Sequence, residues 1–192
     1  MSYNFFALLA RMKYIDRWGL MRNTQTENIQ EHSHQVAVLS HALALIGREK
    51  FGSTVDPGKA AIAGLYHDAS EILTGDLPTP VKYDNPAIKE AYKAVERVAA
   101  DKLLSLLPQE FQEEFSPYVR EELDPQLLRV VKAADKLSAH IKCLEELKAG
   151  NLEFKLAARQ TREALDAMEM PELDYFMKHF LPGFELTLDE LQ

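Results

Sequence analysis

The sequence predicts an all-α fold, a single helical bundle that spans residues 1–192. Apolar residues recur at spacings of three and four in nearly every segment, which is the period of an amphipathic helix. No segment shows the apolar–polar alternation of a half-buried strand. A chain of 192 residues is long enough for one domain with a substantial core and short for two.

The first two predicted helices cover residues 5–14 and 27–48. The apolar residues that define them are Phe5, Leu8, Leu9 and Met12 in the first and Val36, Leu39, Leu43 and Ile46 in the second. The segment between them, 16–26, is expected to be a loop that carries Arg17, Trp18 and Arg22.

Two further helices are expected at 57–74 and 86–107. Asp56 and Pro57 start the earlier one, because an aspartate caps the first N–H groups and proline needs no donor there. Gly75 ends it. Its expected inward residues are Ile62, Leu65, Ala69, Ile72 and Leu73. The segment 76–85 contains Pro78 and Pro80 and must be a loop, after which Asn85 and Pro86 open the next helix.

The last third of the chain is also predicted to be helical. Pro125 opens a long helix to Ala149, which Gly150 stops. Residues 151–168 and 171–180 predict two more helices. Residues 187–190 match a capping box, although few residues follow them.

Composition and charge limit the partners of the protein. The net charge of −8 argues against binding to a nucleic acid polymer, but a metal and one or two arginines in a cleft still suit a small phosphorylated ligand. No apolar run approaches the roughly 18 residues of a membrane span. The N-terminal segment does not resemble a secretory signal, and a single cysteine, Cys143, fits a reducing compartment. We therefore expect a soluble, cytoplasmic protein without a membrane partner.

Polar residues interrupt the inward stripes of three predicted helices. His32 lies one turn before the apolar stripe of its helix, and Asp68 lies within the stripe of the helix at 57–74. Asp135 falls in the apolar run of the long helix. His67 adjoins Asp68, and Glu71, one turn after His67, shares their side.

This set of residues predicts a metal site between helices. A buried carboxylate is costly unless a cation or a metal compensates it. Two imidazoles and two carboxylates suit Mn, Fe, Co, Ni or Zn better than Ca, with His32, His67, Asp68 and Asp135 as ligands. Any one of them alone fits a hydrogen-bonded core residue better than a metal ligand, so the prediction depends on the whole set. No such role is expected of the remaining histidines and the cysteine, which are His34, His41, His140, His179 and Cys143.

The motifs around these residues resemble the H…HD…D signature of the HD-domain metal-dependent phosphohydrolases. The signature is carried by Glu31-His32-Ser33, His67-Asp68-Ala69-Ser70-Glu71 and Ala134-Asp135-Lys136. Within that superfamily the chain is similar to the bacterial 5'-deoxynucleotidases, which remove phosphate from deoxyribonucleoside 5'-monophosphates. That similarity is carried by Arg17-Trp18, Met21-Arg22-Asn23, Thr26-Glu27-Asn28, residues 74–82, residues 142–147 and Asp174-Tyr175-Phe176-Met177. It covers nearly the whole chain.

The resemblance implies an HD fold, a homodimer and one divalent metal ion such as Co, Mn or Zn. It assigns metal ligation to His32, His67, Asp68 and Asp135. It assigns substrate contacts to Arg17, Trp18, Asp76, Leu77, Pro78, Thr79 and to the ligands His32, Asp68 and Asp135. The further histidines of two-metal HD enzymes are not evident, so the site is expected to hold a single ion.

The hypothesis for catalysis gives each residue a separate task. Arg17 grips the phosphate oxygens, because its fork of N–H groups matches them in pairs. Glu71 orients or deprotonates the attacking water, and Asp76 protonates the departing 5' oxygen. Trp18 lies against the sugar and leaves no room for a 2'-hydroxyl.

Two other functions remain open at this stage. One is an HD phosphohydrolase that acts on nucleoside triphosphates or cyclic nucleotides. The other is a non-catalytic helical module that binds a metal or a nucleotide. A structural metal would be fully ligated by protein, whereas a catalytic one leaves positions for water and substrate.

Overall fold

The computed structural model describes residues 2–78, 82 and 85–191, and their regular structure is helical apart from one isolated bridge between Asp16 and Asn28. The prediction of an all-α fold is confirmed. The α-helices are α1 (Phe5–Leu9), α2 (Ile29–Phe51), α3 (Pro57–Tyr66), α4 (Glu71–Thr74), α6 (Pro86–Leu104), α7 (Gln109–Val119), α8 (Pro125–Lys148), α9 (Lys155–Asp166) and α10 (Pro171–His179). Short 3-10 helices cover Ala10–Tyr14, Leu152–Phe154, Leu181–Glu185 and Leu188–Leu191.

Side-chain caps fix the helix starts that the sequence predicted. The Asp56 carboxylate accepts the Lys59 N–H at 2.8 Å at the start of α3, and Asn85 does the same for α6. Asn28 caps α2 within a capping box, so that helix begins two residues later than predicted. Such caps satisfy N–H groups that have no partner within the helix.

The predicted helix at 57–74 is broken, and its inward stripe is confirmed only in part: Ala69 is buried and Ile72 partly buried, whereas Ile62, Leu65 and Leu73 are exposed. A turn at 67–70 separates α3 from α4. Ile62 and Leu65 are 40% and 43% exposed, whereas the small residues Ala60, Ala63 and Gly64 are buried, and Gly64 lies against α2. A Cβ atom on Gly64 would lie 2.7 Å from the Cα atom of Ala37. The two helices therefore touch along small residues, and bulky ones are turned outward.

Two further differences concern short segments. Helix α7 was not predicted, and Val119 is its one buried residue among those described. The second half of the predicted first helix is a 3-10 helix, Ala10–Tyr14. Neither difference alters the class of the fold.

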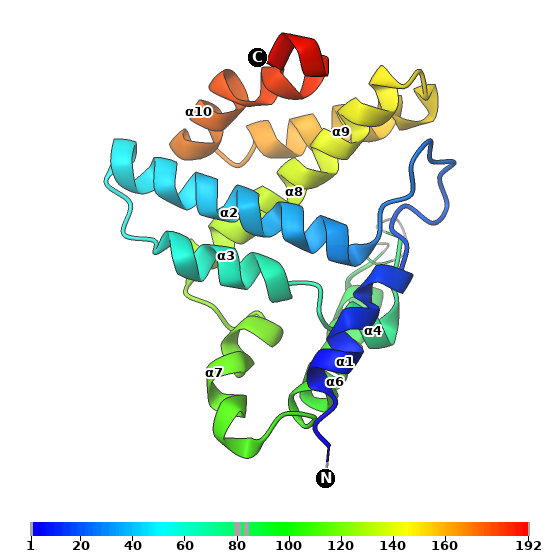
Figure 1. Ribbon diagram of the computed structural model, residues 1–192, viewed down its shortest axis with the longest axis vertical. Helices are drawn as coiled ribbons and strands as arrows, with labels where there is room; N and C mark the ends of the chain where they lie inside the picture. The colour runs from blue at the N-terminus through cyan, green and yellow to red at the C-terminus, as the bar shows by residue number, and fades with distance from the viewer. Residues whose placement is uncertain (1, 79–81, 83–84, 192) are drawn as a thin grey trace.

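Helices α2, α3, α8 and α10 enclose the main hydrophobic core. Figure 1 shows α2 and α3 side by side, α8 crossing behind them and α10 against the other side of α2. A second core joins α1, α6 and α7, and it includes Phe5, Leu103 and Val119. Among the residues described, none of the helices is long and apolar enough to cross a membrane.

Candidate metal centre

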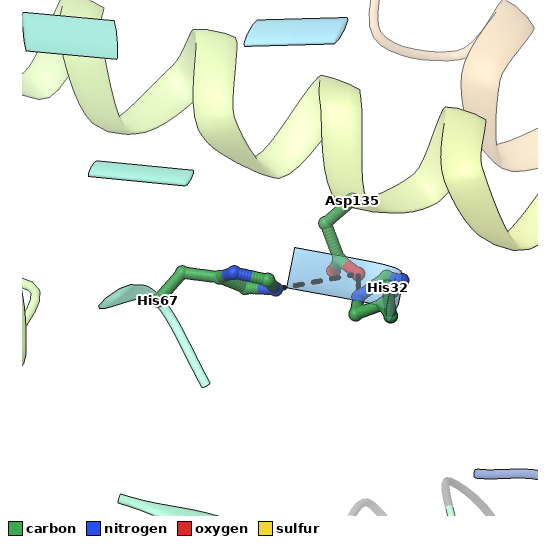
Figure 2. A group of neighbouring side chains, drawn as sticks. All are labelled: His32, His67 and Asp135. Atoms are coloured by element: carbon green, nitrogen blue, oxygen red, sulfur yellow. Dashed lines mark hydrogen bonds and ion pairs between the residues drawn. The ribbon is translucent and has the colours of Figure 1, made fainter. Parts of the chain in front are cut away.

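His32, His67 and Asp135 converge from three helices. His32 lies in the first turn of α2, His67 follows the last residue of α3, and Asp135 lies in the middle of α8. One ligand atom from each lies within 4.8 Å of the others, and the two imidazoles and the carboxylate point toward one another in Figure 2. The close contact at Gly64 brings the rings of His32 and His67 to a centroid distance of 5.2 Å.

Asp68 reaches the same cluster from the turn between α3 and α4. Its predicted place on the inward stripe of a continuous helix was wrong, because the helix ends before it. Its Oδ2 atom nevertheless lies 3.1 Å from His67 Nε2 and 3.5 Å from His32 Nε2. The tight turn thus places two neighbouring side chains, His67 and Asp68, at one point.

Hydrogen bonds on the far side of each imidazole fix its tautomer. His67 Nδ1 donates to the Gly64 carbonyl oxygen at 2.8 Å. His32 Nδ1 lies 3.1 Å from Ser138 Oγ, whose own proton is donated to Gln35 Oε1 at 2.6 Å. Since that hydroxyl has one proton, it accepts from His32. In the neutral imidazoles both Nε2 atoms are then acceptors directed at the cluster, as in metal-binding histidines.

The cluster consequently brings acceptors face to face. His32 Nε2 lies 3.1 Å from Asp135 Oδ1. His67 Nε2 is buried and makes no hydrogen bond of acceptable geometry to any described residue, although Asp68 Oδ2 is 3.1 Å away. Lone pairs at these distances repel unless a proton or a metal cation lies between them. Imidazole nitrogens and carboxylate oxygens are donors for a divalent transition metal, so these residues fit such an ion.

The charge states support the same conclusion. Burial by itself raises the pKa of Asp68, but His67, His32 and Arg17 outweigh it and hold that pKa well below its usual range. Burial by itself also raises the pKa of Asp135, but the hydrogen bond and charge of His32 outweigh it and lower that pKa. Burial by itself lowers the pKa of His67, but Asp68 raises it to about 9. A metal ion held by His67 and Asp68 would take the place of that proton.

Glu71 and Asp76 lie beside the cluster with raised pKa values. Burial, together with the charges of Asp68 and Asp76, raises the pKa of Glu71 to about 9. Its Oε2 atom has no hydrogen-bond partner among the described residues, and its Oε1 atom is 3.7 Å from Lys82 Nζ. Asp76, after the end of α4, also has a raised pKa, chiefly because it is partly buried.

The loop at 16–28 brings Arg17 to the same place. Arg17 Nη1 lies 3.5 Å from Asp68 Oδ2. Trp18 is half-buried, and its ring packs against Phe154 at a centroid distance of 5.3 Å. Both residues also contact Glu27, to which the sequence assigned no role.

The other residues predicted for substrate binding follow α4. Leu77 and Pro78 are partly buried in the segment after Asp76. Thr79 lies outside the described residues.

The sequence did not single out Ser138 and Gln35 either. Each lies three residues after a cluster residue on the same helix, Ser138 after Asp135 and Gln35 after His32. That spacing is the signal that would have indicated them.

The residues expected to be uninvolved lie away from the cluster. His140 is buried, and its Nδ1 atom is 2.9 Å from Thr161 Oγ1 on α9. Cys143 is buried, and burial raises its pKa to about 11. Exposed positions are occupied by His34, His41 and His179.

Comparison with known proteins gives consistent results. Residues 4–184 match the profile of the family described as 5'-deoxynucleotidase YfbR-like. A 5'-deoxynucleotidase of Vibrio vulnificus is 53% identical over 189 residues, which cover 98% of this chain and 97% of the relative. The 5'-deoxynucleotidase YfbR of Escherichia coli O1:K1 is 51% identical over 189 residues, with 98% and 95% covered.

Two solved structures share the fold. An HD-domain phosphohydrolase from Listeria innocua has a TM-score of 0.82 at 23% identity, covering 94% of this chain and 88% of its own. The HD phosphohydrolase DatZ of cyanophage S-2L, bound to dA and one catalytic Zn²⁺ ion, has a TM-score of 0.63 at 22% identity, with 92% and 96% covered.

Proposed function

Because the chain belongs to the YfbR-like 5'-deoxynucleotidase family, we propose that its cluster of two histidines and two aspartates is the metal centre of that activity. The protein is a metal-dependent phosphomonoesterase that hydrolyses deoxyribonucleoside 5'-monophosphates to deoxyribonucleoside and phosphate. The proposed ligands are His32, His67, Asp68 and Asp135. The observation that carries the assignment is that both Nε2 atoms lie 3.1 Å from carboxylate oxygens, His32 from Asp135 and His67 from Asp68.

The metal ion supplies charge that the side chains lack. When bound, a divalent ion neutralises phosphate charge and makes nearby water more acidic. The Zn²⁺ ion of the cyanophage enzyme supports one divalent ion here, and Co and Mn suit the same donors.

Arg17 is placed to hold the substrate phosphate. Its Nη1 atom points at Asp68, on the side of the guanidinium that faces the cluster. Burial by itself lowers the pKa of Arg17, but Asp68 and Glu27 raise it above its usual value, so the group stays charged. A charged fork of N–H groups binds two phosphate oxygens at once.

Glu71 is the proposed base that orients or deprotonates the attacking water. Without a cation the charges of Asp68 and Asp76 help to keep it protonated. Glu71 can act as a base only when deprotonated, and a divalent cation held by Asp68 would favour that form by countering the repulsion. Its unpartnered Oε2 atom is free to accept a proton from water.

Asp76 is the proposed acid that protonates the departing 5' oxygen. Its raised pKa favours the protonated form that this step requires. Of the segment that follows, Leu77, Pro78 and Thr79 are proposed as further substrate contacts.

Trp18 is the proposed determinant of deoxyribose selectivity. Its large ring, seated on Phe154, is expected to fill the space that a 2'-hydroxyl would need. Replacing it by alanine should raise AMP turnover relative to dAMP. An unchanged ratio of deoxyribonucleotide to ribonucleotide turnover would refute this role.

The direct test is phosphate release from dAMP and AMP by metal-stripped protein to which Co, Mn, Zn or Mg is added back. We expect rapid, metal-dependent release from dAMP and little from AMP. Release of pyrophosphate or triphosphate from nucleoside triphosphates, or hydrolysis of cyclic nucleotides alone, would indicate a different HD phosphohydrolase. Binding without turnover of any of these would indicate a non-catalytic module.

We also propose that the protein is a cytoplasmic homodimer in which each chain is a single domain. We propose that it binds neither membranes nor nucleic acid polymers. The single cysteine and the net charge of −8 support the compartment and the absence of nucleic acid. The similarity to the bacterial 5'-deoxynucleotidases supports the dimer. Light scattering on the purified protein would measure its mass directly.

A further inference from the structure

One carboxylate oxygen holds both of the substrate-binding residues of the loop. Glu27 Oε2 accepts a hydrogen bond from Arg17 Nε at 3.0 Å and another from Trp18 Nε1, also at 3.0 Å. The side chains of Arg17 and Glu27 are each 12% exposed, so water competes weakly for these bonds. The residue that binds phosphate and the residue that contacts the sugar are thus joined through a third side chain.

The backbone of Glu27 takes part as well. Its carbonyl oxygen accepts the Arg17 N–H at 2.8 Å, and the bridge between Asp16 and Asn28 lies beside it. Glu27 therefore binds the same two-residue segment through its backbone and its side chain.

Trp18 has a backbone conformation that needs such support. Its φ angle is 58°, in the left-handed region that residues other than glycine rarely adopt. Strained residues of this kind persist only where surrounding contacts hold them, and they are common at functional sites. For Trp18 those contacts include the bond to Glu27, the packing on Phe154, and the hydrogen bond that its carbonyl oxygen accepts from the Met21 N–H at 2.8 Å.

The bond to Arg17 also sets the direction of the guanidinium. Glu27 occupies the Nε position, so the Nη groups are left for the cluster side, where Nη1 lies 3.5 Å from Asp68 Oδ2. A negative charge near a phosphate site opposes binding of the substrate dianion. Its presence is explained if orientation of Arg17 and Trp18 outweighs that repulsion.

We infer that Glu27 is a positioning residue for selectivity: it holds Arg17 and Trp18 at a fixed separation, so that phosphate and deoxyribose are recognised together. This inference rests on the proposed function, in which Arg17 binds the phosphate and Trp18 lies against the sugar. Glu27 touches neither the cluster nor the substrate in this scheme and acts through its two neighbours.

The experiment compares Glu27→Gln and Glu27→Ala with the wild type. Glutamine keeps an oxygen acceptor but not the charge, whereas alanine removes both bonds. Glu153→Gln is the matched control, because Glu153 binds the same loop at the Arg22 N–H, away from Arg17 and Trp18. Steady-state kinetics on dAMP and AMP are measured together with metal content and thermal unfolding.

Fluorescence gives a readout that does not depend on activity. Trp18 is the single tryptophan of the chain, so its emission reports on this loop alone. Loss of the bond to Glu27 should expose the ring, shift its emission to longer wavelength and make it easier to quench.

We expect Glu27→Ala to lower kcat/KM for dAMP about 10- to 100-fold, which is the effect of losing a hydrogen bond to a charged group. The loss on AMP should be smaller, so the dAMP to AMP ratio falls. The ratio for Glu27→Gln should lie between those of the wild type and Glu27→Ala. Glu153→Gln should match the wild type in both the dAMP to AMP ratio and the Trp18 emission.

The outcomes separate this inference from the proposed function. If the wild-type protein does not hydrolyse dAMP, the proposed function is refuted. Active wild type, together with an unchanged ratio and unchanged Trp18 emission in both Glu27 variants, would overturn the inference alone. If the alanine variant fails to fold, the glutamine variant still decides, because a lowered ratio at normal metal content supports the inference and a wild-type ratio overturns it.

Discussion

Glu146 and Glu71 are both almost inaccessible to solvent, at 1% and 4% exposure, yet their surroundings are opposite. Glu146, on α8, accepts hydrogen bonds from Lys142 Nζ, Asn151 Nδ2 and the backbone N–H and hydroxyl of Thr24. Glu71, at the start of α4, has an oxygen with no hydrogen-bond partner among the described residues.

The pKa values follow from this difference. Burial by itself raises the pKa of Glu146, but the bonds from Lys142, Asn151 and Thr24 hold it well below its usual range. Burial and the nearby carboxylates raise the pKa of Glu71 to about 9. Burial alone therefore does not set the role of a glutamate. Glu146, with its hydrogen bonds satisfied, fastens the loop at 16–28 to α8 through Thr24. Glu71, with an unsatisfied oxygen, is available for chemistry.

The largest expected effect is on activity, at Glu71. Glu71→Gln and Glu71→Ala should lower kcat on dAMP by about 10²- to 10⁴-fold, the usual range for loss of a general base. Metal content and thermal stability should stay near wild type, because the buried group is already largely protonated without a metal. Kinetics with metal analysis is the measurement. Substantial residual turnover would take Glu71 off the list of catalytic residues.

At Glu146 the main effect should be on stability. Glu146→Ala leaves Lys142 buried without its partner, which should cost about 3–5 kcal/mol of unfolding free energy. That corresponds to a fall in Tm of roughly 6–20 °C for a domain of this size. The double variant Lys142→Met with Glu146→Leu should recover much of this loss. A Tm of Glu146→Ala within a degree of the wild type would show that the two glutamates are less different than their contacts indicate.

Metal removal should affect the two regions unequally. A chelator should lower stability by about 2.7 kcal/mol relative to protein with metal at 100 times its Kd. Hydrogen exchange should quicken at residues 67–75, beside the cluster, and remain slow at 142–151. Equal quickening in both segments would mean that the metal stabilises the whole bundle rather than its site.

The smallest expected effect is the pH dependence that Glu146 contributes. Because its folded-state pKa lies below the usual 4.5, its stabilisation is present above pH 4.5 and is lost as the pH falls through the lower folded value. The unfolding free energy of the wild type should exceed that of Glu146→Gln by about 1–2 kcal/mol near neutral pH, and this difference should become smaller in acid. Urea unfolding across this range measures it. A gap that is constant with pH would contradict the assignment.

Most helix positions were predictable because their signals are local. Asp56, Asn85 and Pro125 start helices where the sequence placed them, since a cap and its N–H partner are two or three residues apart. The convergence of His32, His67 and Asp135 was predictable in outline, because imidazoles and carboxylates on inward stripes need a compensating cation.

The break after α3 was not predictable from apolar periodicity. Ile62 and Leu65 fit an inward stripe by spacing, but the close approach of α2 at Gly64 admits small residues alone. Packing between helices thus decided which side of α3 faces inward, and Asp68 lies in the turn that follows the helix.

By itself, the sequence determined the helical class, the helix starts and the donor types at the metal centre, because each depends on neighbours along the chain. The tertiary structure alone decided which carboxylates are satisfied. Thr24 and Glu146 are 122 residues apart, His32 and Ser138 are 106 apart, and the ring of Trp18 packs on that of Phe154. A hydrogen bond depends on distance and direction in space, and no spacing in the sequence specifies either across separations of that length.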